Sequence, residues 1–250
     1  GDIGMIMARR LTLEGAHVVG VFEVQPYASG LPRNILQCLD DYGIPLYLSH
    51  TVTQIKGKER LESVVISQVE DNRNPIPGTE TEYPCDTLIL SVGLIPENEL
   101  SLSAGAELDR GSSGPVVDEH HQTTVPGIFA AGNVLQVHDL VDFVSAEAEE
   151  LADSAAAYLQ AGSLSECRLQ VLTDSSVTHA VPRKISGEAD FTLSFRVRKP
   201  AKNCRIRLVQ GGETVFEKKM AKAIPAEMIQ IPVKASWLKK NEDLEVKVEW

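Results

Sequence analysis

The pattern of hydrophobic and polar positions changes its period near residue 165. Before that point, residues 5–13 are typical of a helix that is apolar on most faces, and the alanine-rich residues 141–159 predict a longer helix that ends at Gly162. Beyond it, apolar and polar residues alternate, as in 191–198 and 244–249, which predicts strands with one face toward water. Gly211-Gly212 lies between two such runs and predicts a hairpin turn.

Shorter patterns fill the rest of the first part of the chain. A mixed helical periodicity covers residues 32–42, and residues 96–114 form a polar connection. Apolar runs predict buried strands over 17–23, 44–48 and 87–92. Hairpin strands are predicted over 52–55, 61–69 and 80–84, and short strands over 115–118 and 127–131.

The distribution of charge supports a boundary at the same place. The 250 residues contain 24 Lys and Arg against 35 Asp and Glu, a net charge of −11. Residues 1–165 hold 8 basic against 24 acidic residues, whereas 166–250 hold 16 against 11. The acidic balance argues against nonspecific binding to nucleic acid or anionic membranes. Neither a membrane-spanning apolar run nor a signal-peptide pattern is visible.

Cysteine and histidine usage points to no metal. Cys38, Cys85, Cys167 and Cys204 lie far apart, without a CxxC pair or zinc-ligand spacing, which favours a reduced, cytoplasmic setting. Cys38 and Cys85 are expected to be small buried residues. Surface positions are expected for His120 and His121, for the acidic residues Glu147, Glu149, Glu150 and Asp153, and for the basic residues of the last part, which include Arg196, Arg198, Lys199, Arg205, Arg207, Lys218 and Lys219.

The beginning of the chain has part of a dinucleotide-binding pattern. Gly1 and Gly4 correspond to the second and third glycines of a GxGxxG motif, with Asp2 and Ile3 between them. Glu23 follows Gly4 by 19 residues and ends a predicted strand, where its carboxylate could accept both ribose hydroxyls. The same carboxylate would repel a 2′-phosphate, so NAD is favoured over NADP. The alternative is an ordinary helix start.

A second pattern lies at residues 124–133. A short apolar strand ends at Gly132, which would let a ligand approach the backbone closely. The side-chain oxygen of Asn133 can accept a hydrogen bond from a hydroxyl group of that ligand. The helix that begins near Val141 and Asp142 could aim its N-terminal amides at a flavin or a phosphate. The alternative is a plain strand-turn-helix corner.

Together these motifs resemble the C-terminal part of the pyridine nucleotide-disulfide oxidoreductase superfamily, of the thioredoxin-reductase-like kind. Residues 1–4 with Glu23 resemble its NAD fingerprint, residues 87–93 followed by Pro96 its strand that crosses to the FAD domain, and residues 126–133 its second FAD motif. Residues 85–100, 132–144 and 225–228 are similar to an uncharacterised bacterial branch that accompanies anaerobic glycerol 3-phosphate dehydrogenases. The resemblance covers residues 1 to about 160, and the part beyond matches that branch alone.

The resemblance implies an α/β fold of Rossmann-like FAD- and NAD(P)-binding segments, followed by a small antiparallel β-sandwich. The expected domains are an NAD-binding domain at 1–98 without its first strand, the C-terminal part of an FAD-binding domain at 99–165, and the sandwich at 166–250. The first FAD fingerprint would lie upstream, so we expect a truncated chain that binds FAD poorly by itself. Asn133 replaces the family's usual Asp, and Leu140-Val141 replace Arg-Gln.

The implied function is FAD-dependent hydride transfer from NADH to flavin. NAD would bind at Gly1, Asp2, Ile3, Gly4, Glu23 and Gly93, and FAD at Gly132, Asn133, Val141 and Asp142. No catalytic residue is assigned, although His138 is a candidate proton relay near the flavin. The acceptor stays open between a disulfide, a quinone and a partner dehydrogenase subunit, and a homo-oligomer is compatible with the sequence. The alternative function is a non-catalytic docking module of an oxidoreductase complex.

Overall fold

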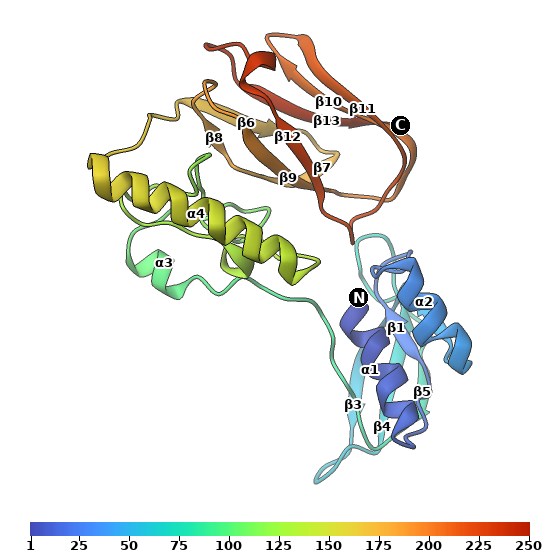
Figure 1. The fold of residues 1–250 in the computed structure, drawn as a ribbon. Coiled ribbons are helices and arrows are strands. Elements are labelled where there is room, and N and C mark those ends of the chain that lie inside the picture. Colours follow the sequence, from blue (N-terminus) through green and yellow to red (C-terminus); the bar gives the residue numbers. More distant parts are fainter. The chain divides into compact units, whose positions relative to one another are not determined.

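The computed structural model describes residues 1–250, which divide into two compact units, Gly1–Gly93 and Leu94–Trp250 (Figure 1). The finer division into domains at 1–98, 99–165 and 166–250 stays a prediction. No helix has both the length and the apolar character needed to cross a membrane.

The first unit combines two helices with two small sheets. Helix α1 (Asp2–Leu13) and helix α2 (Pro32–Cys38), which is followed by the 3-10 turn η1 (Asp40–Tyr42), lie against a parallel pair of strands. That pair is β1 (Val21–Glu23) and β2 (Leu46–Leu48). An antiparallel meander consists of β3 (His50–Lys56), β4 (Ser63–Gln68) and β5 (Thr81–Pro84). The small core is made of Met5, Ala8, Cys38, Leu39 and Ile44.

The predicted buried strand over residues 87–92 is wrong. This segment forms no strand, and Leu90 and Val92 are 68% and 89% exposed. A strand exists only where a neighbour takes up its backbone hydrogen bonds. The sheet of β1 and β2 contains no third strand, so an apolar sequence alone did not produce one.

The second unit begins with an irregular segment and two helices, α3 (Glu99–Ser103) and the long α4 (Val141–Ala161). Between them, η2 (Gly132–Val134) forms one 3-10 turn. Gly162 ends α4 in the left-handed conformation, as predicted, with φ of 77°. The strands predicted over 115–118 and 127–131 are absent, because these segments make only isolated bridges.

The sandwich confirms the period-two pattern of the last 85 residues, which span 166–250. One sheet has the order β11-β10-β13-β6-β8 and the other the order β12-β9-β7. The strands are β6 (Leu169–Thr173), β7 (Val177–Val181), β8 (Lys184–Ile185), β9 (Phe191–Val197), β10 (Ala201–Gln210), β11 (Glu213–Ala223), β12 (Ile229–Val233) and β13 (Leu244–Glu249). One pair departs from the predicted antiparallel arrangement, because β13 runs parallel to β6.

The two sheets share one core. Fully buried side chains such as Phe195 of one sheet and Leu208 of the other belong to the same apolar cluster. Gly211 and Gly212 join β10 to β11 with φ values of 54° and 80°, the left-handed pair that a two-residue hairpin turn needs. A smaller cluster includes Leu135 and Val181, which ties the segment before α4 to strand β7.

Candidate functional site

The start of α1 is fastened to the start of α2. The Oδ1 atom of Asp2 accepts hydrogen bonds from the Leu31 backbone N–H at 2.8 Å and from the Asn34 side-chain amide at 2.7 Å. Gly30 lies against the same turn, and a Cβ there would approach the Asp2 nitrogen to 3.1 Å and Asp2 Oδ1 to 2.7 Å. The Asp2 side chain is therefore engaged in hydrogen bonds within the protein, whereas a Cβ at Gly1 would meet open space.

Glu23 ends β1 beside this helix start. Its side chain is 11% exposed, and its Oε2 atom lies 3.6 Å from the Gly1 nitrogen. The Gln25 backbone N–H donates to Oε1 at 3.0 Å, and the Ser29 hydroxyl donates to Oε2. The structure thus brings together two residues of the predicted NAD site, Gly1 and Glu23, and holds the carboxylate in a fixed orientation.

Two residues near Glu23 were not predicted from the sequence. Burial raises the pKa of Tyr27, and the negative charge of Glu23 raises it further, while the guanidinium of Arg73 opposes the shift. Tyr27 therefore lies within electrostatic reach of both side chains. The available signal was the turn sequence that follows the acid, Pro26-Tyr27, but nothing in the pattern predicted that Arg73, in a distant hairpin, would be near.

The other residues predicted for NAD occupy separate environments. Ile3 is 63% exposed, and Gly93 adopts a φ of 100° in open space. A Cβ on Gly4 would lie 3.2 Å from the Cβ of Ser91, so the glycine allows the two segments to approach closely.

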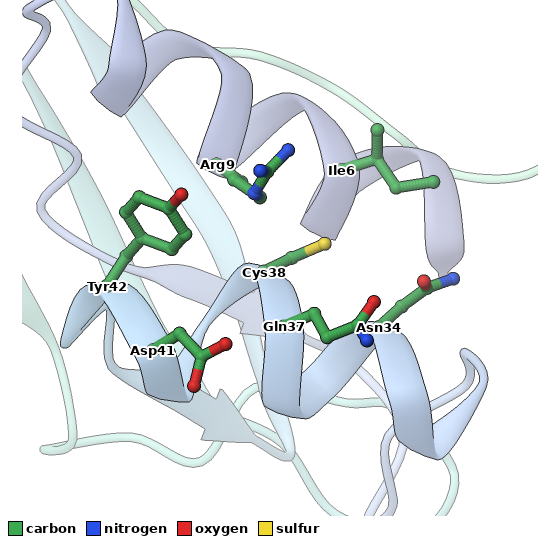
Figure 2. Close-up of a pocket in the computed structure, with 7 residues that line it drawn as sticks. All are labelled: Ile6, Arg9, Asn34, Gln37, Cys38, Asp41 and Tyr42. Atoms are coloured by element: carbon green, nitrogen blue, oxygen red, sulfur yellow. The ribbon is translucent and has the colours of Figure 1, made fainter.

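A groove of about 690 Å³ lies between α1 and α2 (Figure 2). Arg9 lies over the ring of Tyr42, with 5.3 Å between the guanidinium carbon and the ring centroid. The other lining residues are Ile6, Asn34, Gln37, Cys38 and Asp41. None of the residues predicted to bind NAD lines this groove.

In the second unit, Gly132 lies over a buried carboxylate. The Gly132 backbone N–H donates to Glu147 Oε2 at 2.5 Å, and the Gln136 side-chain amide donates to Oε1 at 3.1 Å. The Nε2 atom of His138 lies 3.4 Å from Glu147 Oε1, and only 1% of the His138 side chain is exposed. The expectation that Glu147 lies on a solvated face is therefore wrong, because this turn of α4 packs against η2.

His138 and Glu147 shift each other's pKa. Burial alone would lower the pKa of His138, but the nearby charge of Glu147 raises it above its usual value. Burial alone would raise the pKa of Glu147, but His138 and the donors from Gly132 and Gln136 lower it. Both shifts favour the charged forms of the two side chains, next to the predicted flavin motif.

The N-terminus of α4 is open. Leu140 precedes it in extended conformation, with φ of −135° and ψ of 144°, and no side chain caps the helix. Val141 is 74% exposed, and Asp142 is also exposed. The side-chain oxygen of Asn133 accepts the His138 backbone N–H at 3.1 Å and so holds the loop before the helix.

An apolar pocket of about 230 Å³ lies next to Asn133. Leu94 and Ile95 line it and are 65% and 84% exposed. The remaining lining residues are Glu97, Val134 and Val137. Uncapped helix amides and an apolar pocket that share the Asn133 loop are suited to a ligand with both an anionic or carbonyl part and a flat apolar part.

Arg196 of the sandwich reaches the loop before α4. Its guanidinium forms an ion pair with Asp139 and donates to the carbonyls of Val137 at 2.8 Å and Pro225 at 3.1 Å. The Met228 backbone N–H donates to the other oxygen of Asp139 at 2.7 Å. The expectation that Arg196 lies on a water-exposed face is therefore wrong, since its side chain is only 15% exposed.

Residues 1–158 match the family described as pyridine nucleotide-disulphide oxidoreductase. The chain belongs to this family. Its members' description indicates an oxidoreductase that uses a pyridine nucleotide, in agreement with the predicted class of enzyme.

Several characterised proteins are similar to the chain. An NADH oxidase of Methanocaldococcus jannaschii is 32% identical over 155 residues, which are 59% of this chain and 30% of the oxidase. A putidaredoxin reductase of Pseudomonas putida is 41% identical over 58 residues, 23% of this chain and 13% of the reductase. The crystal structure of a thioredoxin reductase of T. acidophilum covers 57% of this chain and 45% of that protein, with 24% identity and a TM-score of 0.49. The chain spans about a third or less of the length of these two curated relatives.

Proposed function

We propose that the protein transfers a hydride from NADH to a bound flavin, with the nicotinamide nucleotide bound by the first unit and FAD by the second. The observation that carries this proposal is the position of Glu23, whose carboxylate lies 3.6 Å from the nitrogen of Gly1 at the start of α1. A carboxylate at the end of a strand, beside the start of the helix that precedes the strand, is the arrangement that accepts ribose hydroxyls next to a pyrophosphate.

The residues of the first unit fit the adenosine end of NAD. The backbone of Asp2 and Ile3 offers amides at the positive end of α1 beside Gly1, and Gly4 keeps α1 close to Ser91. Glu23 would accept the ribose hydroxyls in place of the Ser29 hydroxyl, and its negative charge disfavours the 2′-phosphate of NADP. Gly93 completes the set that we assign to NAD.

The residues of the second unit fit the flavin. Gly132 and Asn133 would face the ribityl and pyrophosphate part, and the uncapped amides of Val141 and Asp142 would donate to the ring or to a phosphate. When bound, FAD supplies the centre that accepts two electrons. Glu147 accepts the Gly132 backbone N–H, and His138 lies against Glu147, so we assign both residues a role in positioning this turn. No catalytic residue is assigned.

We further propose that the electrons pass to a protein acceptor. Relatives of this chain are named as a ferredoxin reductase of Castellaniella defragrans, a ferredoxin reductase component of a chlorobenzene dioxygenase, and the putidaredoxin reductase. A partner dehydrogenase subunit is the second candidate for the acceptor, on the resemblance of residues 225–228 to the branch that accompanies anaerobic glycerol 3-phosphate dehydrogenases. The four unpaired cysteines support a cytoplasmic setting.

An anaerobic absorbance spectrum of the natural full-length protein tests the proposal. We expect a flavin band that NADH bleaches, that NADPH bleaches more slowly, and that a ferredoxin-type acceptor restores. A colourless protein, or a flavin that neither nucleotide reduces, would overturn the proposal and favour a docking module.

A further inference from the structure

Three metal-ligating side chains that belong to neither proposed cofactor site converge in the second unit. One ligand atom each of Glu119, His120 and Cys167 lies within 4.8 Å of the other two. Glu119 and His120 belong to the irregular segment before η2, whereas Cys167 lies in the connection between α4 and β6. The thiol comes from a segment far in sequence from the adjacent carboxylate and imidazole, so the fold brings the three groups together.

A tight turn allows two neighbouring residues to face the same point. The His121 backbone N–H donates to the Asp118 carbonyl at 3.0 Å, and His121 adopts a φ of 60°. The Asp118 side chain accepts the backbone N–H groups of His120 at 2.9 Å and Gln122 at 3.0 Å. This turn is therefore held by its own hydrogen bonds and presents Glu119 and His120 together.

The cluster is enclosed by the start of the sandwich. The backbone of Asp118 forms an isolated parallel β-bridge with that of Lys184 in β8, and the Arg183 backbone N–H donates to the Val117 carbonyl at 2.8 Å. The His120 and His121 side chains are partly buried, with 20% and 12% of their surface exposed.

The carboxyl group of Glu119 is buried and has no Lys or Arg side chain within ion-pair distance. Its side chain is 1% exposed, and it accepts from the backbone N–H and the hydroxyl of Ser186. The one ionisable nitrogen atom within 4 Å is His120 Nε2, at 3.9 Å. Burying a carboxylate is costly unless a positive charge compensates it. The neighbouring thiol adds a further ligand that binds cations as a thiolate.

We propose that Glu119, His120 and Cys167 bind a divalent cation of the zinc class. Thiolate, imidazole and carboxylate are the three ligand types that Zn²⁺ takes in proteins, and hard cations such as Mg²⁺ and Ca²⁺ avoid thiolate. The imidazole Nε2 atom now lies 2.9 Å from the Ser165 hydroxyl and would exchange that contact for the cation. Three protein ligands leave a fourth position for water.

The cation would fasten three segments of the second unit. Cys167 lies two residues before β6, and Glu119 is already bonded to Ser186, directly after β8. Binding would therefore connect the end of α4, the 118–121 turn and the first strands of the sandwich. Because ligands that bind the folded state selectively stabilise it, we expect Zn²⁺ to raise the unfolding temperature of the second unit.

Cobalt binding to the chain, produced without a polyhistidine tag and stripped with EDTA, tests the site. We expect one equivalent of Co²⁺ to produce a thiolate-to-cobalt charge-transfer band in the near ultraviolet, and Zn²⁺ to displace it. Cys167→Ser should abolish the band, and His120→Gln should weaken Zn²⁺ binding by roughly tenfold or more. Cys85→Ser changes a cysteine in the other unit and should leave the charge-transfer band and the affinity for Zn²⁺ unchanged.

Two results would overturn the proposal. One is the absence of the charge-transfer band in the unsubstituted chain, and the other is a band that persists in Cys167→Ser. Circular dichroism of the metal-free variants checks that they are folded. As a second measurement that needs no variant, Zn²⁺ should slow the reaction of Cys167 with a thiol reagent, and mass spectrometry of the labelled peptides should show equal labelling of Cys85 with and without the ion.

Discussion

Arg196 in β9 and Asp139, two residues before α4, form an ion pair that joins the sandwich to the loop in front of the proposed flavin helix. The pair is mostly buried, with side chains 15% and 18% exposed, and both partners make further hydrogen bonds. The sandwich therefore contacts the segment that precedes α4 and fixes the position of Asp139.

Replacement of Arg196 by alanine should destabilise the second unit. The substitution leaves the Asp139 carboxylate with one donor and removes the donors to Val137 and Pro225. We expect the free energy of unfolding to fall by about 1–3 kcal/mol, as measured by urea denaturation. Arg196→Lys should lower the free energy of unfolding by less than Arg196→Ala does. Lys199→Ala, at an exposed position in the same segment, should change it by no more than about 0.5 kcal/mol. Equal stabilities for Arg196→Ala and Lys199→Ala would contradict this assignment.

The role of Glu23 predicts a difference between the two nicotinamide nucleotides. Glu23→Gln removes the charge that favours ribose hydroxyls and disfavours a 2′-phosphate. We expect NADH binding to weaken roughly tenfold, which corresponds to about 1.4 kcal/mol, and NADPH binding to change less. Titration calorimetry of the full-length protein measures both constants. Glu59→Gln is the matched control at an exposed position of the same unit, and an equal loss for both nucleotides would argue against a ribose ligand.

Glu147→Gln should uncouple the buried pair beneath Gly132. Without the carboxylate, burial dominates and the pKa of His138 should fall, which NMR titration of the imidazole resonances measures. The Gly132 N–H would also lose a charged acceptor, so we expect a cost of about 1–3 kcal/mol in unfolding free energy. Glu149→Gln alters an exposed glutamate of the same helix and should leave the His138 titration unchanged. An unchanged pKa in Glu147→Gln would show that the pair does not form.

His179 predicts an acid-sensitive stability. Burial lowers its pKa to about 4, with Arg196 and Arg183 adding to the shift and Asp109 opposing it. In the unfolded chain His179 takes up a proton below about pH 6.5, whereas in the folded chain it stays neutral until about pH 4. The free energy of unfolding therefore falls as the pH drops from about 6.5 toward 4. At pH 5 the loss relative to pH 7 should be about 2 kcal/mol in urea unfolding.

A substitution isolates this contribution. His179→Gln should reduce the pH dependence between pH 7 and pH 5, whereas His17→Gln, at an exposed position of the first unit, should retain it. If the two variants lose stability equally on acidification, another group is responsible.

Local patterns predicted most of the regular structure. The helix at α4 and its end at Gly162, the hairpin at Gly211-Gly212, and the alternating strands of the sandwich all depend on periodicity and on single-residue conformational preferences. The segment 87–92 failed because the same apolar composition forms a strand only beside a partner. The parallel pairing of β13 with β6 was missed because alternation does not reveal strand direction.

The sequence by itself determined the family, the long helix α4, the alternating strands of the sandwich and the candidate cofactor motifs, because these depend on residues close together in the chain. Only the tertiary structure decided which polar side chains become partners: Glu147 with His138, Arg196 with Asp139, and Glu119 with His120 and Cys167. A charged residue on an exposed helix face and one in a buried pair look alike in a sequence. The difference arises from the path of the chain, which brings distant groups together and removes them from water.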